Sequence, residues 1–235
     1  MTEKNQAAKM MQLEPGDIAL VGFPDDRNSS HAKGASEGPD RIRRAFHNPS
    51  SNKSCESAID LGSEARLKIM TDPPIDSFFK DISAAVSQVL DKKARLLALG
   101  GDHAITYPIF HAYRSFYPQL QILHIDAHPD LYDNFDNNPF SHASPFARIM
   151  ENKLADSLIQ VGIRTLNPHQ KEQSDRFGTR ILKPGEQGQI AELLVDNTPL
   201  YISIDMDGLD PAFAPGVSHP EPGGLSTREL IEILQ

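Results

Sequence analysis

The sequence has 235 residues, an apolar fraction of 39% and a net charge of -9 at pH 7. This length suits one α/β domain with a sizeable core, and the acidic balance excludes a typical nucleic-acid binder, which would show a basic stripe. No apolar run approaches the roughly 20 residues needed to cross a bilayer. The sole cysteine, Cys55, has no partner for an internal disulfide, which is typical of a reducing compartment. We expect a cytoplasmic protein that binds neither nucleic acid nor membrane.

The predicted elements follow residues 1–17, a stretch that lacks the apolar middle of a secretory signal and predicts a frayed or partly helical lead-in. Apolar runs bounded by turn formers predict strands at 17–24, 57–61, 94–99, 121–125, 157–163, 179–182 and 200–205. Amphipathic stretches predict helices at 40–46, 74–92, 105–117, 145–151, 168–176, 186–196 and 227–234. This alternation indicates an α/β fold with a mostly parallel sheet covered on both faces. We expect residues 1–235 to form a single domain.

Three of the predicted strands end in residue types that bind metal ions. The strand 121–125 is followed by an Asp-x-His-x-Asp run, whose spacing lets three side chains share one small volume. The strand 200–205 ends in Asp-Met-Asp, and the strand 94–99 is followed by Gly-Gly-Asp-His. Because ligands collect at the carboxyl ends of parallel strands, the sequence predicts one site built from three places. The candidate ligands are His103, Asp126, His128, Asp130, Asp205 and Asp207.

These candidate ligands suit a pair of divalent cations. Four carboxylates and two imidazoles are too many for one tetrahedral zinc ion, whereas two dications balance four carboxylates. Oxygen-rich donors with one imidazole for each ion favour Mn²⁺ over Zn²⁺. Two ions about 3.5–4 Å apart can share a water and lower its pKa toward neutrality, so that hydroxide attacks an electrophilic carbon without a Ser or Cys nucleophile.

The histidines and acidic residues outside these clusters receive separate interpretations. His142 follows the polar loop 131–141 and suits proton transfer, since an ordinary imidazole has a pKa of about 6.5; a hydrogen-bonded structural role is the alternative. His124 lies inside a strand and is interpreted as structural. Asp102 and Asp210 adjoin the clusters and are interpreted as turn residues or as supports for the ligands. The histidines with no motif around them are interpreted as loop or surface residues: His31, His47, His111, His169 and His219.

Three segments resemble the signature segments of the ureohydrolases, the arginase and agmatinase family. They are GGDHAITYP (100–108), HIDAHPDLYD (124–133) and SIDMDGLDPAFAPGVSHPEPGGLS (203–226). The resemblance extends over residues 17–235, and the stretch 126–151 looks most like plant-type arginases and their bacterial relatives. It implies a three-layer αβα fold, a dinuclear manganese site and a trimeric or hexameric homo-oligomer. It also implies hydrolysis of a small guanidino substrate, arginine or agmatine, to urea and an amine, within arginine or polyamine metabolism.

The resemblance also implies roles for individual residues. His142 matches the catalytic histidine of the family, and Asp126 serves catalysis as a ligand that bridges both ions. The loop 131–141 offers Asn134, Asn138 and Ser141 to a substrate. It has no cationic side chain to pair with the α-carboxylate that arginine has and agmatine lacks, so both substrates remain open. By motif, one ion takes His103, Asp126, Asp130 and Asp205, and the other takes Asp126, His128, Asp205 and Asp207.

The C-terminal end departs from the family pattern. The sequence ends at Gln235, whereas similar proteins continue for several dozen residues, with a glutamate that binds the guanidinium group and a strand beside the one that ends at Asp205. We therefore expect the domain to lack the family's C-terminal strand and helix. The alternatives are formimidoylglutamase or another guanidino or amidino hydrolase, a zinc amide hydrolase such as a deacetylase, and a truncated, non-catalytic metal-binding relative. The second Asp-x-Asp favours two metals over a single zinc.

Overall fold

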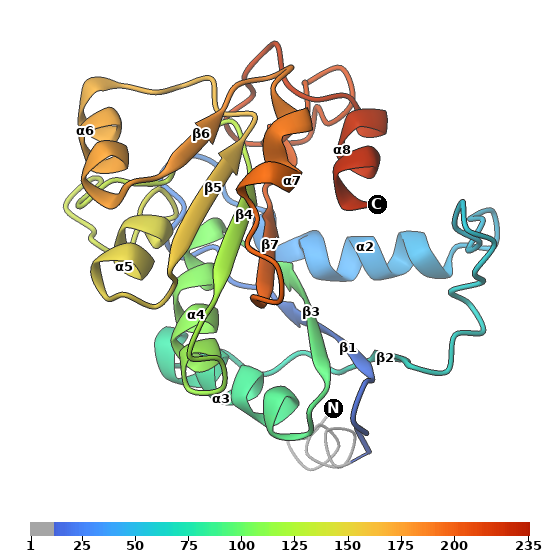
Figure 1. Cartoon of the computed structure of the whole chain (residues 1–235). Helices are drawn as coiled ribbons and strands as arrows, with labels where there is room; N and C mark the ends of the chain where they lie inside the picture. The colour runs from blue at the N-terminus through green and yellow to red at the C-terminus, as the bar shows by residue number, and fades with distance from the viewer. Residues whose placement is uncertain (1–11) are drawn as a thin grey trace. The chain divides into compact units, whose positions relative to one another are not determined.

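The structure, a computed structural model, describes residues 12–235, so most of the lead-in expected at 1–17 lies outside the described residues. Two compact units make up the described chain. The first holds residues 12–27 and 33–116, and the second holds residues 28–32 and 117–235. Each unit contains one parallel sheet with its helices (Figure 1). A single domain over residues 1–235 stays a prediction.

The first unit is built on a three-stranded parallel sheet in the order β2-β1-β3. Its strands are β1 (Ile18–Phe23), β2 (Leu67–Ile69) and β3 (Arg95–Gly100). Its helices are η1 (Ala35–Glu37), α2 (Gly38–His47), α3 (Phe78–Asp91), η2 (His103–Ile105) and α4 (Thr106–Arg114). The start of α3 is fixed by Asp81, whose carboxylate accepts hydrogen bonds from the N–H groups of Asp76 and Ser77.

The second unit is built on a four-stranded parallel sheet in the order β6-β5-β4-β7. Its strands are β4 (Gln121–Ile125), β5 (Ser157–Val161), β6 (Arg180–Leu182) and β7 (Leu200–Ile204). Its helices are α5 (Pro145–Glu151), α6 (Pro168–Phe177), η3 (Gln187–Gln189), α7 (Ile190–Leu193), η4 (Met206–Gly208) and α8 (Thr227–Leu234). Parallel strands joined through helices confirm the predicted α/β class.

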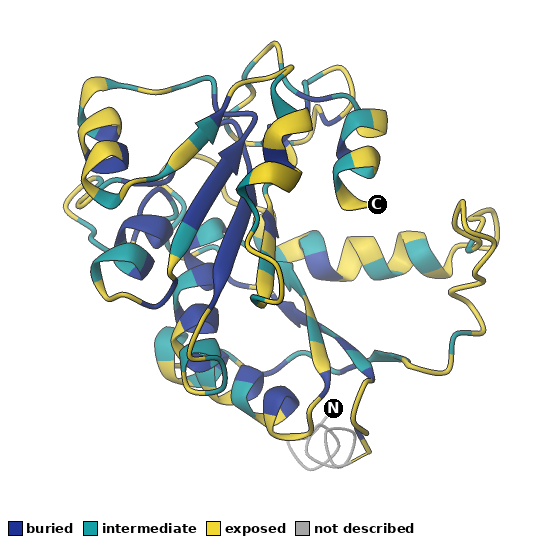
Figure 2. Ribbon diagram, in the orientation of Figure 1, coloured by how far each residue is buried: buried dark blue, intermediate teal, exposed yellow. Residues whose placement is uncertain are grey.

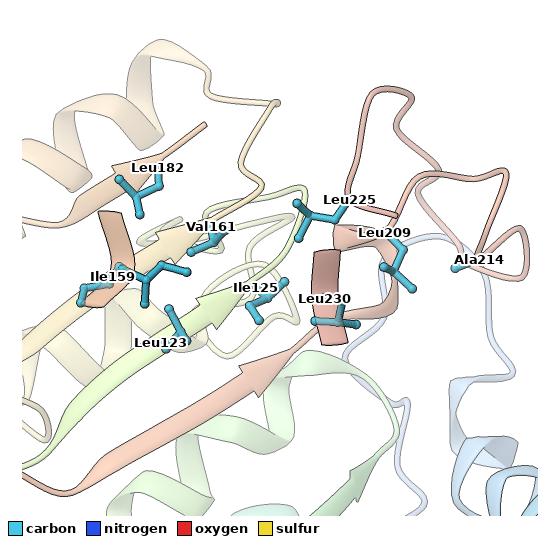
Figure 3. Packing of buried hydrophobic residues seen from close by; sticks show 10 residues of the cluster. Leu123, Ile125, Ile159, Val161, Leu182, Leu209, Ala214, Leu225 and Leu230 are labelled. Carbon is cyan, nitrogen blue, oxygen red and sulfur yellow. The ribbon is translucent and has the colours of Figure 1, made fainter. Parts of the chain in front are cut away.

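One face of the second sheet carries an apolar core. Leu123 of β4 is paired with Ile159 of β5, and Ile125 is paired with Val161. Side chains of paired residues point to the same face of a sheet. Helices α7 and α8 cover this face, and Leu230 of α8 packs among these side chains (Figure 3). The four apolar side chains of this face on β4 and β5, those of Leu123, Ile125, Ile159 and Val161, are at most 2% exposed.

This covered face does not extend fully onto β7. Ile202 and Ile204 stand in register with Leu123 and Ile125, yet each is 40% exposed. Figure 2 shows the contrast between the dark β4 and the largely exposed β7. The apolar surface of the sheet therefore continues past the residues that cover it.

Most predicted elements are confirmed, and one strand is wrong. The strand 121–125 and the helices 145–151 and 227–234 have the predicted bounds, and Ser226 and Glu229 form the predicted capping box. Residues 57–61 instead belong to a turn region with an isolated antiparallel bridge between Ser54 and Asp60; the second strand of the first unit is β2. Helix α7 ends at Leu193, short of the predicted 196.

Candidate metal centre

The centre forms where β4 and β7 end side by side. These strands are parallel neighbours with Ile125 opposite Ile204, so Asp126 and Asp205 leave the sheet at the same edge. The Asp205 N–H donates to the carbonyl of Ile125 at 2.9 Å. The Asp205 carboxylate accepts a hydrogen bond from the N–H of Asp207 and so begins the single turn η4. That turn returns Asp207 to the side of the β4 loop.

Asp126, His128 and Asp207 gather at this edge. One ligand atom from each lies within 4.8 Å of the other two. His128 Nδ1 is 3.3 Å from Asp207 Oδ2 and 3.5 Å from Asp126 Oδ1. Both carboxylates are buried, Asp126 at 1% exposure and Asp207 at 8%. Because β4 ends at Ile125, the cluster is made by the loop after the strand rather than by side-chain alternation within it.

The electrostatics of this cluster favour a cation. Burial raises the pKa of Asp207 to about 8, and the carboxylates of Asp126 and Asp205 add to the increase, although the hydrogen bond to His128 opposes it. Burial would lower the pKa of His128, but its contacts with Asp126 and Asp207 outweigh burial and raise the value to about 11. The buried carboxylates therefore attract positive charge, and this donor set fits a hard divalent cation.

The structure places the other predicted ligands as follows. Asp130, four residues after Asp126, is 5% exposed, and its backbone has a φ of 51°, in the left-handed region. Asp205 raises the pKa of Asp207 through its charge. His103 lies in the first unit at the start of η2, where the Asp102 carboxylate caps the helix by accepting from the Ala104 N–H. Asp102 is thus a turn residue, as interpreted.

His142 is held in the second unit by several contacts. Its Nε2 lies 2.8 Å from the hydroxyl oxygen of Ser30, and its N–H donates to the Asn28 carbonyl at 3.4 Å. The ring of Phe135 meets its ring edge-on at 6.2 Å between centroids. Because a hydroxyl can both donate and accept, His142 Nε2 can form this hydrogen bond with or without a proton on the nitrogen.

The predicted substrate contacts differ in exposure. Asn138 is partly buried, and its Nδ2 donates to the Asn28 side-chain oxygen at 3.0 Å. Ser141 is 3% exposed, and its hydroxyl oxygen accepts from the Ala143 N–H. Asn134 is exposed. Asn138 and Ser141 thus support the loop that carries His142.

Two histidines interpreted only as loop or surface residues lie beside the centre. The ring of His219 stacks on His142 with 5.5 Å between centroids, and it meets His128 edge-on at 6.0 Å. His31 lies 5.8 Å from His219. Burial lowers the pKa of His219, and the neighbouring histidines add to this effect. In the sequence, His219 is marked by its position in the Pro- and Gly-rich part of the signature-like segment 203–226.

Two anchors hold the segment that carries His219. The Asp210 carboxylate accepts from the N–H groups of Ala212, Gly223 and Gly224, which closes the loop and lowers the pKa of Asp210. The Arg164 guanidinium donates to the carbonyl oxygens of Asp207 and Glu221 at 2.7 and 2.6 Å. The Glu221 carboxylate is thereby placed 3.9 Å from His128 Nε2.

Fold and site together define an α/β protein with a buried carboxylate–imidazole cluster at the carboxyl ends of parallel strands. The Arginase family model matches residues 16–235. Arginase 1, mitochondrial, of Arabidopsis thaliana is 40% identical, and the match covers 98% of this chain and 73% of that protein. An agmatinase of Bacillus anthracis is 30% identical, over 94% of this chain and 78% of that protein.

The solved structures agree with the family match. The arginase from Medicago truncatula has a TM-score of 0.89 and 36% identity, and the match covers 99% of this chain and 80% of that one. The chain belongs to the arginase family, as its three signature segments predict. Among the described residues, none of the helices has the length and hydropathy needed to cross a bilayer.

Proposed function

We propose that this chain is a dimanganese ureohydrolase that hydrolyses arginine to urea and an amine, with agmatine as the second candidate substrate. The buried cluster of Asp126, His128 and Asp207 supports this proposal most strongly, because its carboxylates need a cation. Plant relatives named arginase are more similar to the chain than the relative named agmatinase, at 40% against 30% identity. This difference favours arginine.

The ligand roles follow the sequence. By the family resemblance, His128 and Asp207 would hold one cation and Asp130 would hold the other, while Asp126 and Asp205 would serve both. His103, in the first unit, stays a predicted ligand of that second cation. When bound, the cations offset the charge of the carboxylates and polarise water for attack on the guanidinium carbon.

The chain's own residues provide the proton transfer. Attack of water on the guanidinium carbon gives a tetrahedral intermediate, and cleavage of its C–N bond releases an amine whose nitrogen must gain a proton. His142 supplies that proton, with its Nε2 beside the Ser30 hydroxyl and its ring steadied by His219 and Phe135. The proposal extends to a homo-oligomer, a trimer or hexamer, as the family resemblance implies.

A urea-release assay tests this function. The chain is incubated with arginine, agmatine or formimidoylglutamate, after chelation and again after Mn²⁺ is restored. We expect urea from arginine that disappears on chelation and returns with Mn²⁺. Urea from agmatine alone would assign the second substrate, and formamide from formimidoylglutamate would assign a formimidoylglutamase. Bound Mn²⁺ without turnover of any of these compounds would favour a non-catalytic metal-binding relative.

A further inference from the structure

A chain of hydrogen bonds lies directly behind Asp126. His124 Nε2 is 2.8 Å from Asp126 Oδ2, and His124 Nδ1 is 2.9 Å from Gln160 Nε2. Gln160 Nε2 also donates to the carbonyl of Pro129 at 2.6 Å. His124 and Gln160 are fully buried, and Asp126 is 1% exposed. The protons in these hydrogen bonds are therefore positioned by neighbouring protein groups rather than by bulk solvent.

The pairing of β4 with β5 aligns the side chains that form these hydrogen bonds. His124 of β4 stands in register with Gln160 of β5, so both side chains point to the same face. The ring of His124 packs on the ring of Phe146, with 3.9 Å between centroids. The imidazole thus has little freedom to turn away from Gln160 or from Asp126.

The carbonyl of Pro129 fixes the orientation of the Gln160 amide. A carbonyl oxygen only accepts, so a flipped amide would place two oxygens 2.6 Å apart. The nitrogen must therefore face Pro129, and its second hydrogen points to His124 Nδ1. His124 Nδ1 therefore accepts this hydrogen bond and carries no proton. The imidazole proton is on Nε2, which donates a hydrogen bond to Asp126.

The other atom of the Gln160 amide, Oε1, gives further support for this hydrogen-bond pattern. Gln160 Oε1 is buried and has no hydrogen-bond partner among the described residues. A buried polar atom without a partner destabilises a fold. An apolar side chain of similar size would avoid this loss of stability. We therefore attribute the presence of an amide here to the two hydrogen bonds that its nitrogen donates.

We propose that Gln160 and His124 are positioning residues for Asp126. Gln160 selects the Nε2–H form of His124, and His124 then fixes one oxygen of the carboxylate. The other oxygen accepts from the His128 N–H at 2.6 Å, so the carboxylate is held at both ends. This inference depends on the proposed function only in treating Asp126 as a metal ligand. It makes His124 a partner of that ligand rather than a ligand itself.

Two variants and a matched control test the proposal. Gln160→Leu removes both donations, and Gln160→Glu offers an acceptor that draws the proton to Nδ1. Gln121→Leu is the control, because Gln121 is also buried and donates to two carbonyls, those of Val195 and Thr198, but lies at the opposite end of β4. Imidazole ¹⁵N shifts of the metal-free protein report the form of His124, and calorimetric titration with Mn²⁺ reports affinity.

The wild type should show His124 protonated on Nε2 and bare on Nδ1, and Gln160→Glu should protonate Nδ1. Gln160→Leu should weaken Mn²⁺ binding about 10–100-fold, while Gln121→Leu binds as the wild type does. A wild-type His124 protonated on Nδ1 would overturn the proposal, as would a Gln160→Leu variant with unchanged Mn²⁺ affinity. A wild type without any Mn²⁺ affinity would instead count against the proposed function, and the nitrogen shifts would still decide the hydrogen-bond pattern.

Discussion

Strands β4 and β7 look alike in sequence but differ in their surroundings. Both are five-residue strands rich in apolar side chains, and each is followed directly by an aspartate of the candidate metal centre. Every residue of β4 is buried, whereas Leu200, Ile202 and Ile204 of β7 are 39–40% exposed. The comparison shows that the position of a candidate ligand depends on where its strand ends. The burial of the strand depends instead on which other residues cover its face.

The largest expected effect is at the end of β4. Asp126→Asn keeps the shape of the side chain but removes the charge that two cations would share. Urea release and Mn²⁺ affinity should both fall by more than about 100-fold, because loss of a ligand exceeds the cost of losing a supporting residue. Asp136→Asn, an exposed position in the following loop, is the control. An Asp126→Asn variant with wild-type urea release would show that Asp126 is not a ligand.

The next effect separates the covered strand from the exposed one. Leu123→Ala removes a side chain that is 2% exposed and should lower the free energy of unfolding by about 2–5 kcal/mol. Ile202→Ala, in register with it on β7, is 40% exposed and should cost less than about 1 kcal/mol. Urea denaturation measures both. Equal losses would show that something covers β7 in solution.

A smaller effect is expected from pH. The pKa values of Asp207 and His128 are raised to about 8 and about 11, so the metal-free fold holds protons that the unfolded chain releases. Their contribution to stability therefore falls as the pH rises, from about 4 to 8 for Asp207 and from about 6.5 to 11 for His128. Mn²⁺ bound to these side chains would replace the protons, so the Tm increase on adding Mn²⁺ should grow between about pH 6 and pH 8. A shrinking increase would contradict this electrostatic account.

The smallest effect concerns the loop after β7. Asp210→Ala removes the acceptor for three N–H groups and loosens the segment that carries His219 and Glu221. KM should rise while Mn²⁺ affinity stays unchanged, since Asp126, His128 and Asp207 are untouched. Asp196→Ala, on the surface of the same unit, provides the control. Loss of Mn²⁺ binding by Asp210→Ala would mean that the loop helps to form the centre itself.

Much of this arrangement is predictable from sequence because it is local. The strand before Asp126 and the capping box at Ser226 follow from periodicity and turn chemistry over a few residues. The approach of His31 and His219 could not be predicted, since they are far apart in the chain and meet only through loops. The strand predicted at 57–61 is wrong for a related reason. Ile59 and Leu61 flank Asp60 in the alternating pattern of a strand, but their side chains are 49% and 40% exposed and the segment joins neither sheet.

Anomalous diffraction at the manganese edge, on crystals of the chain grown with Mn²⁺, tests the central claim most directly. The account predicts two peaks about 3.5–4 Å apart, with Asp126 in contact with both and with His128 and Asp207 in contact with one. Crystals that show no peak at these side chains, or a single peak held by other residues, would contradict it.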